Sequence, residues 1–308
     1  MNSADPHPPI QLRPRRATEL IDVSFQLWRR TFRSLRNFTM TVAAPFSALA
    51  AATAYKSTEA TRSQRGSNAF GVALGPLSIL TVFLLSLALI PVLHNALVGG
   101  SQTVGESVRY GLRQTPKAVI YTLLSIIAFF ALSLVGLGVF GAAFAAIFVV
   151  ARAGGVIVVV VVIILGMVLY IVLLVTMLGL GSRFQVGAVA LVVEKVRPME
   201  ALRRGFRLTK KRWLAFGATQ AVVLVLSYLL IGIPTAIALS VASDSASQPT
   251  FAAIAAFLVS LIYILWWIPM YTGLGVSMYV DARVRVEAID LDSLSGQLSN
   301  SWSPTTLS

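Results

Sequence analysis

The chain lacks cysteine altogether and carries little charge for its 308 residues. Without cysteine it can form no disulfide, no thiolate nucleophile and no cysteine-ligated metal site. Only 12% of its residues are charged, whereas a soluble domain has roughly 25%. These absences exclude a disulfide-stabilised secreted domain and argue against an ordinary soluble fold.

Acidic residues and histidines are also scarce, at 12 Asp plus Glu and two His. Several acids stand at the start of polar, helix-like stretches, as Glu19, Glu106 and Glu200 do. A metal site needs several ligands at close helical or loop spacing, and no such pattern occurs. No set of Ser, His and acid is visible either. We therefore predict a protein that is not an enzyme, with no metal site and no cofactor.

Long hydrocarbon runs make up most of what is present, because 56% of the residues are hydrophobic. Crossing a membrane takes about 20 apolar residues. Residues 118–182 as one helix would be about 98 Å long, so the chain has to fold back near Arg152. We predict an all-α integral membrane protein with six transmembrane helices arranged as three hairpins. The predicted spans are 38–55, 71–98, two within 118–182 (the second continuing toward 193), 214–242 and 251–280.

The basic residues flank these spans unevenly. Of the 25 Lys and Arg, 21 fall in the N-terminal arm, the second and fourth loops and the C-terminal tail. The positive-inside rule then places both termini in the cytosol of a multi-pass plasma-membrane protein. Because the charges flank apolar segments, the excess of basic residues predicts membrane lipids, anionic ones among them, as partners. It does not favour nucleic acid.

A repeat is visible when the segments around Glu19, Glu106 and Glu200 are aligned without gaps. Apolar residues recur two and six positions later, and Arg30, Lys117 and Lys211 are all basic. Each segment precedes two spans, which predicts three tandem units, each made of a cytosolic amphipathic interfacial helix and a transmembrane hairpin. The alternative is that the segments are not repeats, because any basic amphipathic helix that precedes a span has this pattern. The predicted domains are a disordered arm at 1–16, repeat units at 17–98, 99–195 and 196–280, and a cytosolic tail at 281–308.

The basic interfacial helices are the first candidate functional residues. Each surface Lys or Arg is attracted to anionic lipid by roughly 1 kcal/mol. The alternative is that these charges only set the orientation of the protein. The predicted head-group-binding residues are Arg203, Arg204, Arg207, Lys210 and Lys211 of the third segment, with Arg29, Arg30 and Arg33 of the first.

Polar residues within the apolar sequence form a second candidate group. His94 and Asn95 lie in the second span, shortly after Pro91, and ionisable groups inside membranes are often functional. The alternative is a His near the cytosolic interface that hydrogen-bonds a neighbouring helix. Arg183 either extends to the cytosolic head groups or binds an anionic head group between helices. Gly136, Gly138 and Gly141 match G-x-G-x-x-G, but in a span they indicate close helix packing and leave open a break there.

Three segments resemble a known family. The first starts at Glu194 and includes ALRRGFRLTKKRW at 201–213. The second is YVDARVRVEAIDLD at 279–292, and the third is the opening RATELIDVSFQLWRRTF at 16–32. They are similar to the integral membrane domain found beside glycerophosphoryl diester phosphodiesterases, which also occurs as stand-alone bacterial membrane proteins. The resemblance implies a multi-span module in a bacterial inner membrane and no hydrolase activity.

The predicted function is a lipid-contacting scaffold or accessory subunit. A transporter or permease-like component, with its pathway between the hairpins near Pro91, His94 and Pro269, is the alternative. An accessory role in glycerophospholipid metabolism follows only from the resemblance.

Overall fold

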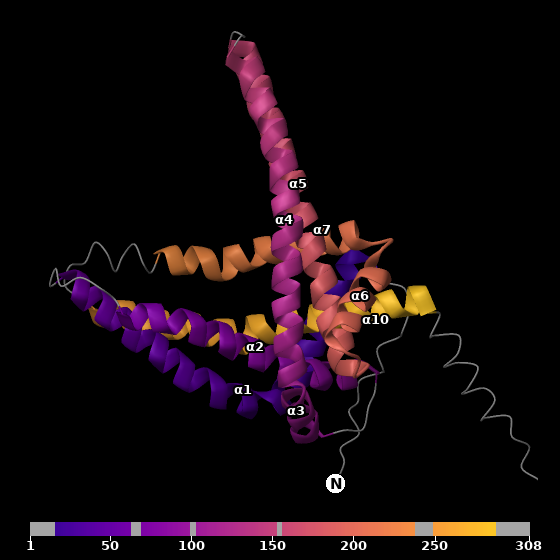
Figure 1. Cartoon of the computed structure of the whole chain (residues 1–308). Helices are drawn as coiled ribbons and strands as arrows, with labels where there is room; N and C mark the ends of the chain where they lie inside the picture. Colours follow the sequence, from indigo (N-terminus) through magenta and orange to yellow (C-terminus); the bar gives the residue numbers. More distant parts are fainter. Residues whose placement is uncertain (1–15, 63–68, 99–102, 153–155, 238–248, 288–308) are drawn as a thin grey trace, which may run out of the picture. The chain divides into compact units, whose positions relative to one another are not determined.

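The computed structural model describes residues 16–62, 69–98, 103–152, 156–237 and 249–287 (Figure 1). Every regular element in these ranges is a helix. Six of the helical stretches are long and apolar enough to cross a membrane: Thr18–Lys56, Leu80–Val98, Thr115–Gly138, Ile163–Val193, Trp213–Ile237 and Thr250–Glu287. The prediction of an all-α, multi-pass membrane protein is confirmed.

The chain divides into two compact units. The first consists of Met1–Arg113 with Ile231–Ser308, and the second of Gln114–Leu230. These limits do not follow the predicted repeat units, because residues of 196–280 fall in both compact units and residues 99–113 join the first. The threefold repeat and its hairpins stay a prediction. The predicted arm at 1–15 and the tail from 288 onward lie outside the described residues.

In the first unit, helix α1 runs without interruption from Ala17 to Arg62. The sequence predicts an interfacial helix that ends before a separate span at Phe38, and this boundary is absent. The physical reason is that no Gly or Pro occurs between Ala17 and Pro45, so nothing ends the helix at the predicted position. Pro45 itself lies inside α1.

The buried face of α1 combines leucines with small hydroxyl residues. Leu20, Leu27 and Leu35 are each at most 3% exposed. Between them lie Ser24 and Thr31, whose Oγ atoms donate to the carbonyls four residues earlier at 2.7 Å. This face packs against α9 (Pro249–Ile262) and α10 (Ile268–Glu287). Small side chains with internally satisfied hydroxyls allow such close helix packing in an apolar surrounding.

Apolar and aromatic residues recur at steps of four and three over 21–35 of α1, and two of them, Phe25 and Trp28, contact another helix. The ring of Phe25 lies 6.0 Å from that of Trp266, and Trp28 Nε1 donates to the Leu265 carbonyl at 3.3 Å. Leu265 lies in the π-helical segment η2 (Tyr263–Trp267), which joins α9 to α10. Pro269 has no N–H, so the carbonyl four residues earlier loses its helical donor. Trp28 supplies the missing hydrogen bond.

Helices α2 (Ala69–Val98) and α3 (Val104–Arg113) pack on each other in the first unit. Pro91 frees the carbonyl of Leu87 in the same way. A Cβ on Gly111 of α3 would lie 2.5 Å from this oxygen and 3.1 Å from Ala88 Cα. Only glycine therefore lets α3 lie against α2 at the proline.

Helix α3 starts with a capping box. The backbone N–H of Thr103 donates to Glu106 Oε2 at 3.1 Å, and the N–H of Glu106 donates to Thr103 Oγ1 at 3.4 Å. These two bonds satisfy two donors that the first turn leaves free. The hydrogen bonds from Thr103 lower the pKa of Glu106 from its usual value.

In the second unit, α4 (Thr115–Arg152) and α5 (Val156–Val193) lie antiparallel. The hydroxyl of Tyr121 donates to the Phe184 carbonyl at 2.6 Å, and Ser133 Oγ donates to Met177 Sδ at 3.4 Å. The second contact lies later in α4 and earlier in α5 than the first, so the two helices run in opposite directions. Helix α4 continues through Gly136–Gly141 without a break, and this glycine motif follows no strand.

Two shorter helices complete the second unit. They are α6 (Pro198–Thr209) and α7 (Trp213–Ser227), and both pack against α5. A second π-helical segment, η1 (Tyr228–Gly232), follows α7 and precedes Pro234. The motif Y-x-L-x-x-I-P thus occurs at 228–234 and at 263–269, with a π-helix over its first five residues both times.

Candidate functional site

The basic face of α6 is positioned by a sharp reversal after α5. Helix α5 ends at Val193, and Lys195 has φ 59, in the left-handed region. A left-handed residue just past a helix end turns the chain away from the helix axis. Pro198 then starts α6, with Glu200 in its first turn. These features place α6 back against the last turns of α5.

Glycines bring α6 and α7 into close contact with α5. A Cβ on Gly205 of α6 would overlap the Arg183 carbonyl and lie 2.9 Å from Gly187 Cα. On α7, a Cβ on Gly217 would lie 2.9 Å from Gly179 Cα. Such glycine-on-glycine crossings let helix backbones approach closely. They hold α6 by one face and leave its other face outside the contact.

The exposed face of α6 carries the predicted cations. Arg203 and Arg207 are exposed, and so are Lys210 and Lys211 in the turn before α7. No ion pair joins these four to another described residue. The sequence predicts an apolar stripe of an interfacial helix through Leu202 and Phe206, whereas the buried positions of α6 are those of Ala201, Gly205, Leu208 and Thr209. The stripe is rotated because glycine contact, rather than side-chain size, decides which face packs.

Arg204 differs from its neighbour Arg203. Its Nε donates to Glu194 Oε2 at 2.9 Å and its second guanidinium nitrogen to Oε1 at 3.1 Å. Both side chains of this pair are 16% exposed. The bidentate pair ties α6 to the end of α5, so Arg204 contributes to the architecture of the basic face. Its guanidinium is already occupied.

Arg183 lies among aromatic rings of the same unit. Its guanidinium carbon is 5.1 Å from the centre of the Phe206 ring and 4.9 Å from that of Trp213. Both distances are in the range of cation–π attraction. Among the described residues, none accepts a hydrogen bond from its buried Nε. The structure therefore places Arg183 in contact with α6 and with the first residue of α7, beside the basic face.

The predicted cations of the first segment lie on α1, in the other compact unit. Arg29 and Arg33 are exposed, while Arg30 is half-buried and has a further interaction. They flank the aromatic side chains that pack on η2. Each unit thus has its own exposed basic residues.

His94 and Asn95 contact neighbouring helices of the first unit. Asn95 Nδ2 donates to Ser107 Oγ of α3 at 3.0 Å. The His94 ring lies 6.3 Å from that of Tyr279 in α10, and Arg283 donates to the Tyr279 hydroxyl at 3.2 Å. Asn95 thus joins α2 to α3 by a hydrogen bond, and the hydrogen-bonding alternative for His94 stays a prediction. Arg183 belongs to the second unit, so a cavity shared with His94 stays a prediction.

Within the described ranges, no three His, Asp or Glu side chains group together as ligands for a metal ion. Arg285 pairs with the buried Asp281 at 3.1 Å, and Arg283 with Glu287 at 2.9 Å. These carboxylates take part in ion pairs along α10.

Comparisons of the chain with protein-family models, with curated proteins and with solved structures find no match. The resemblance to the membrane domain found beside glycerophosphoryl diester phosphodiesterases stays a prediction.

Three structural features escaped the sequence reasoning. The T-x-x-E pattern of Thr103–Glu106 is a readable capping-box signal. The repeated Y-x-L-x-x-I-P motif is also visible in the sequence. The pairing of Arg204 with Glu194 had no local signal, because ten residues and a chain reversal separate the two side chains.

Proposed function

We propose that this chain is a non-catalytic, multi-pass plasma-membrane protein that contacts lipid head groups through the basic face of α6 and the turn into α7. The observation that carries the proposal is the contrast between the two faces of α6. One face is held on α5 by glycine contacts, and the other exposes Arg203, Arg207, Lys210 and Lys211. A rigidly held helix with an unpaired basic face suits a scaffold or accessory subunit on an anionic membrane surface.

The expected strength of this contact follows from the charge count. Four exposed cations at roughly 1 kcal/mol each contribute up to about 4 kcal/mol of attraction to anionic lipid. Salt reduces this value, because exposed charges are screened beyond a Debye length of about 8 Å at physiological ionic strength. The contact should therefore enrich anionic lipids around the protein and weaken as salt is added.

The deciding experiment measures which lipids stay with the full-length protein. The protein is purified from membranes of mixed zwitterionic and anionic lipid, and the retained lipids are counted by native mass spectrometry. We expect Arg203→Gln, Arg207→Gln, Lys210→Gln and Lys211→Gln together to remove the anionic enrichment. Unchanged enrichment in this quadruple variant would contradict the proposal.

Arg204 provides a matched control, because it is adjacent to Arg203 on the same helix. Arg204→Gln breaks the pair with Glu194, so it should lower the thermal stability with little effect on lipid enrichment. Arg203→Gln should do the reverse. Equal effects of the two substitutions on lipid retention would indicate that charge number alone, without the exposed face, determines binding.

The orientation is tested separately. With both termini in the cytosol, a reporter inserted at Gln102 should read as cytosolic and one at Ser245 as external. The reversed pattern would place the basic face on the outer surface and remove the basis of the proposal.

The alternative function is a transporter-like component. Its support is the position of the His94 ring, 6.3 Å from the ring of Tyr279, whose hydroxyl accepts a hydrogen bond from Arg283. His94 and Tyr279 lie in two helices that have the length of membrane spans. Under this alternative, His94→Gln should abolish solute flux in reconstituted vesicles. Under the scaffold proposal, the same substitution leaves lipid enrichment unchanged.

A further inference from the structure

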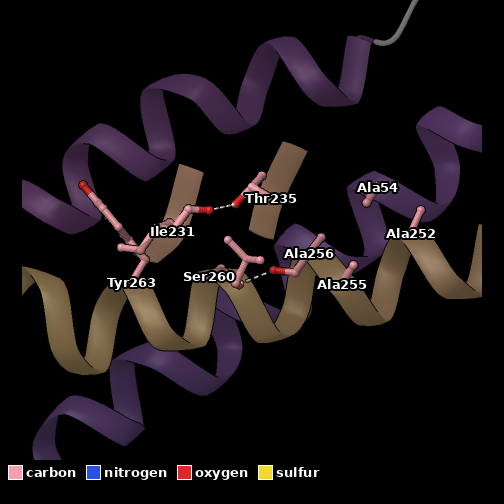
Figure 2. A pocket seen from close by; sticks show the side chains of 9 residues that line it. Ala54, Ile231, Thr235, Ala252, Ala255, Ala256, Ser260 and Tyr263 are labelled. Carbon is pink, nitrogen blue, oxygen red and sulfur yellow. Dashed lines mark hydrogen bonds between the residues drawn. The ribbon is translucent and has the colours of Figure 1, made fainter. Parts of the chain in front are cut away.

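The first compact unit contains a cavity of about 410 Å³ (Figure 2). One wall is formed by Ala252, Ala255, Ala256, Val259 and Ser260 of α9, and by Tyr263, which follows α9 as the first residue of η2. The other walls are formed by Ala54 of α1, Ile231 of η1 and Thr235. The cavity is separate from the basic face of α6, which belongs to the second unit.

The lining of α9 makes the cavity a narrow slot. The six positions recur at steps of three and four, so they lie on one helix face. From Ala252 to Tyr263 this face extends about 16 Å at 1.5 Å per residue. A volume of about 410 Å³ over this length corresponds to a mean cross-section of about 25 Å². These are the proportions of a single extended hydrocarbon chain.

The chemistry of the wall also matches hydrocarbon. Thr235 Oγ1 donates to the Ile231 carbonyl at 2.5 Å, and Ser260 Oγ donates to the Ala256 carbonyl at 2.7 Å, as Figure 2 shows. Each hydroxyl hydrogen is therefore bonded within its own helix. Among the residues that the structure describes, no charged side chain lines the slot. A polar ligand would lose its hydration in the slot without gaining hydrogen bonds in return, whereas an alkyl chain has no hydrogen-bonding groups to desolvate.

The slot begins where three candidate spans end. Ala54 lies two residues before the end of the first span at Lys56, and Thr235 two residues before the end of the fifth at Ile237. Ala252 lies two residues after the start of the sixth span at Thr250. Tyr263, at the other end of the α9 stripe, is eleven residues deeper along the sixth span. The slot therefore extends from near these three ends further into the sixth candidate span.

Both π-helical segments contribute to the inner part of the slot. Ile231 belongs to η1 and Tyr263 starts η2. Insertions of this kind inside α-helices occur frequently at functional sites, because the extra residue locally displaces the helix face. The repeated Y-x-L-x-x-I-P motif thus supplies lining residues from both of its copies.

We propose that this slot binds one acyl chain of a membrane phospholipid, whose head group lies at the surface defined by Lys56, Ile237 and Thr250. The occupant is a phospholipid chain because the slot starts near the ends of three candidate spans, is lined by apolar surface and has the cross-section of one chain. This site is independent of the proposed head-group contact at α6. It concerns the hydrocarbon part of a lipid, in a different compact unit and at different span ends.

The test uses the full-length protein in bilayers that contain a phospholipid with a photoactivatable group near the end of one acyl chain. After irradiation, the cross-linked residues are mapped by mass spectrometry. We expect adducts at the slot positions of α9, above the level at Ile254 and Leu258, which are exposed on the same helix at 55% and 51%. Adducts no more frequent in the slot than at these two positions would overturn the proposal.

A filled slot provides the second arm. Ala256→Phe places a ring in the slot and should abolish the slot adducts, while Leu258→Phe on the exposed face of α9 should leave them unchanged. Ser260→Leu is a smaller filling variant, to be used if Ala256→Phe does not yield folded protein. Slot adducts that persist in a folded filling variant would overturn the proposal. The quadruple variant that removes the four cations of α6 and the turn into α7 should not alter the slot adducts. The proposal for the slot and the proposal for the basic face can therefore be refuted independently.

Discussion

The glycine contact between α6 and α5 can be tested by adding one methyl group. Gly205→Ala places a Cβ against the Arg183 carbonyl and 2.9 Å from the backbone N and Cα of Gly187. All three atoms belong to the α5 backbone, so no side chain can rotate out of the way. Helix α6 must move away from α5, and the Glu194–Arg204 pair must lengthen with it.

The magnitude follows from two opposing effects. Overpacking a close contact typically costs 1–3 kcal/mol. Alanine favours the helix over glycine by about 1 kcal/mol. We therefore expect a net loss of about 0–2 kcal/mol in the free energy of unfolding for Gly205→Ala. Gly138 of α4 is the matched control, because a Cβ there meets nothing within 4 Å, and Gly138→Ala should be stabilising by up to about 1 kcal/mol.

The assay is thermal or denaturant unfolding of both variants in the same detergent, followed by tryptophan fluorescence. The two substitutions are chemically identical, so only the surroundings of the added methyl can give them opposite signs. If Gly205→Ala is as stable as Gly138→Ala, the close approach of α6 and α5 is wrong. The placement of the basic face would then lose its structural basis.

Three further predictions concern single contacts. Lys195 has a left-handed backbone conformation, which glycine adopts without strain and alanine does not. The free energy of unfolding of Lys195→Gly should therefore exceed that of Lys195→Ala by about 1 kcal/mol, because both substitutions remove the same side chain. Trp28→Phe should lower the free energy of unfolding by about 1–3 kcal/mol, because the Leu265 carbonyl then lacks the indole donor. Most of this loss should vanish when Trp28→Phe is made in the Pro269→Ala variant, where the introduced alanine can donate its own N–H. Equal losses with and without Pro269 would refute the role given to Trp28. The lowered pKa of Glu106 means that its carboxylate stabilises α3 above its ordinary pKa, and that this stability is lost as pH falls through the lowered value. Thr103→Ala removes the hydroxyl but keeps the backbone N–H that donates to Glu106, so carboxyl NMR titration should show the pKa of Glu106 rising only part of the way toward its ordinary value. No change would exclude a contribution of the Thr103 hydroxyl.

Local sequence patterns account for much of the fold. The six spans follow from apolar runs that exceed the thickness of a bilayer, and the chain reverses after Arg152 where the length of the run requires it. The predicted interfacial segments near Glu106 and Glu200 correspond to the separate helices α3 and α6. The segment near Glu19 does not form a separate helix, because its continuity with the first span depends on a few residues around Asn37 that carry no strong helix-ending signal.

The partners of the candidate residues followed less closely from the sequence. Arg203 and Arg204 are adjacent and look equivalent in the sequence, yet one is exposed and the other is paired with Glu194. The difference arises because the left-handed turn at Lys195 brings the end of α5 beside one edge of α6. The aromatic stripe of α1 was read as an interfacial face, and its Trp28 instead satisfies a carbonyl 237 residues away.

By itself, the sequence determined the helical class and the approximate spans, because these depend on local hydrophobicity. The side of the membrane on which the basic residues gather stays a prediction. Tertiary structure alone decided which helix faces meet. Glycine contacts set the face of α6 that is left exposed, and proline-freed carbonyls set the partners of α1 and α3. It also decided that small residues of α9 line a slot where larger ones would have closed the gap. These outcomes depend on the approach of segments distant in the chain, and no local pattern encodes that approach.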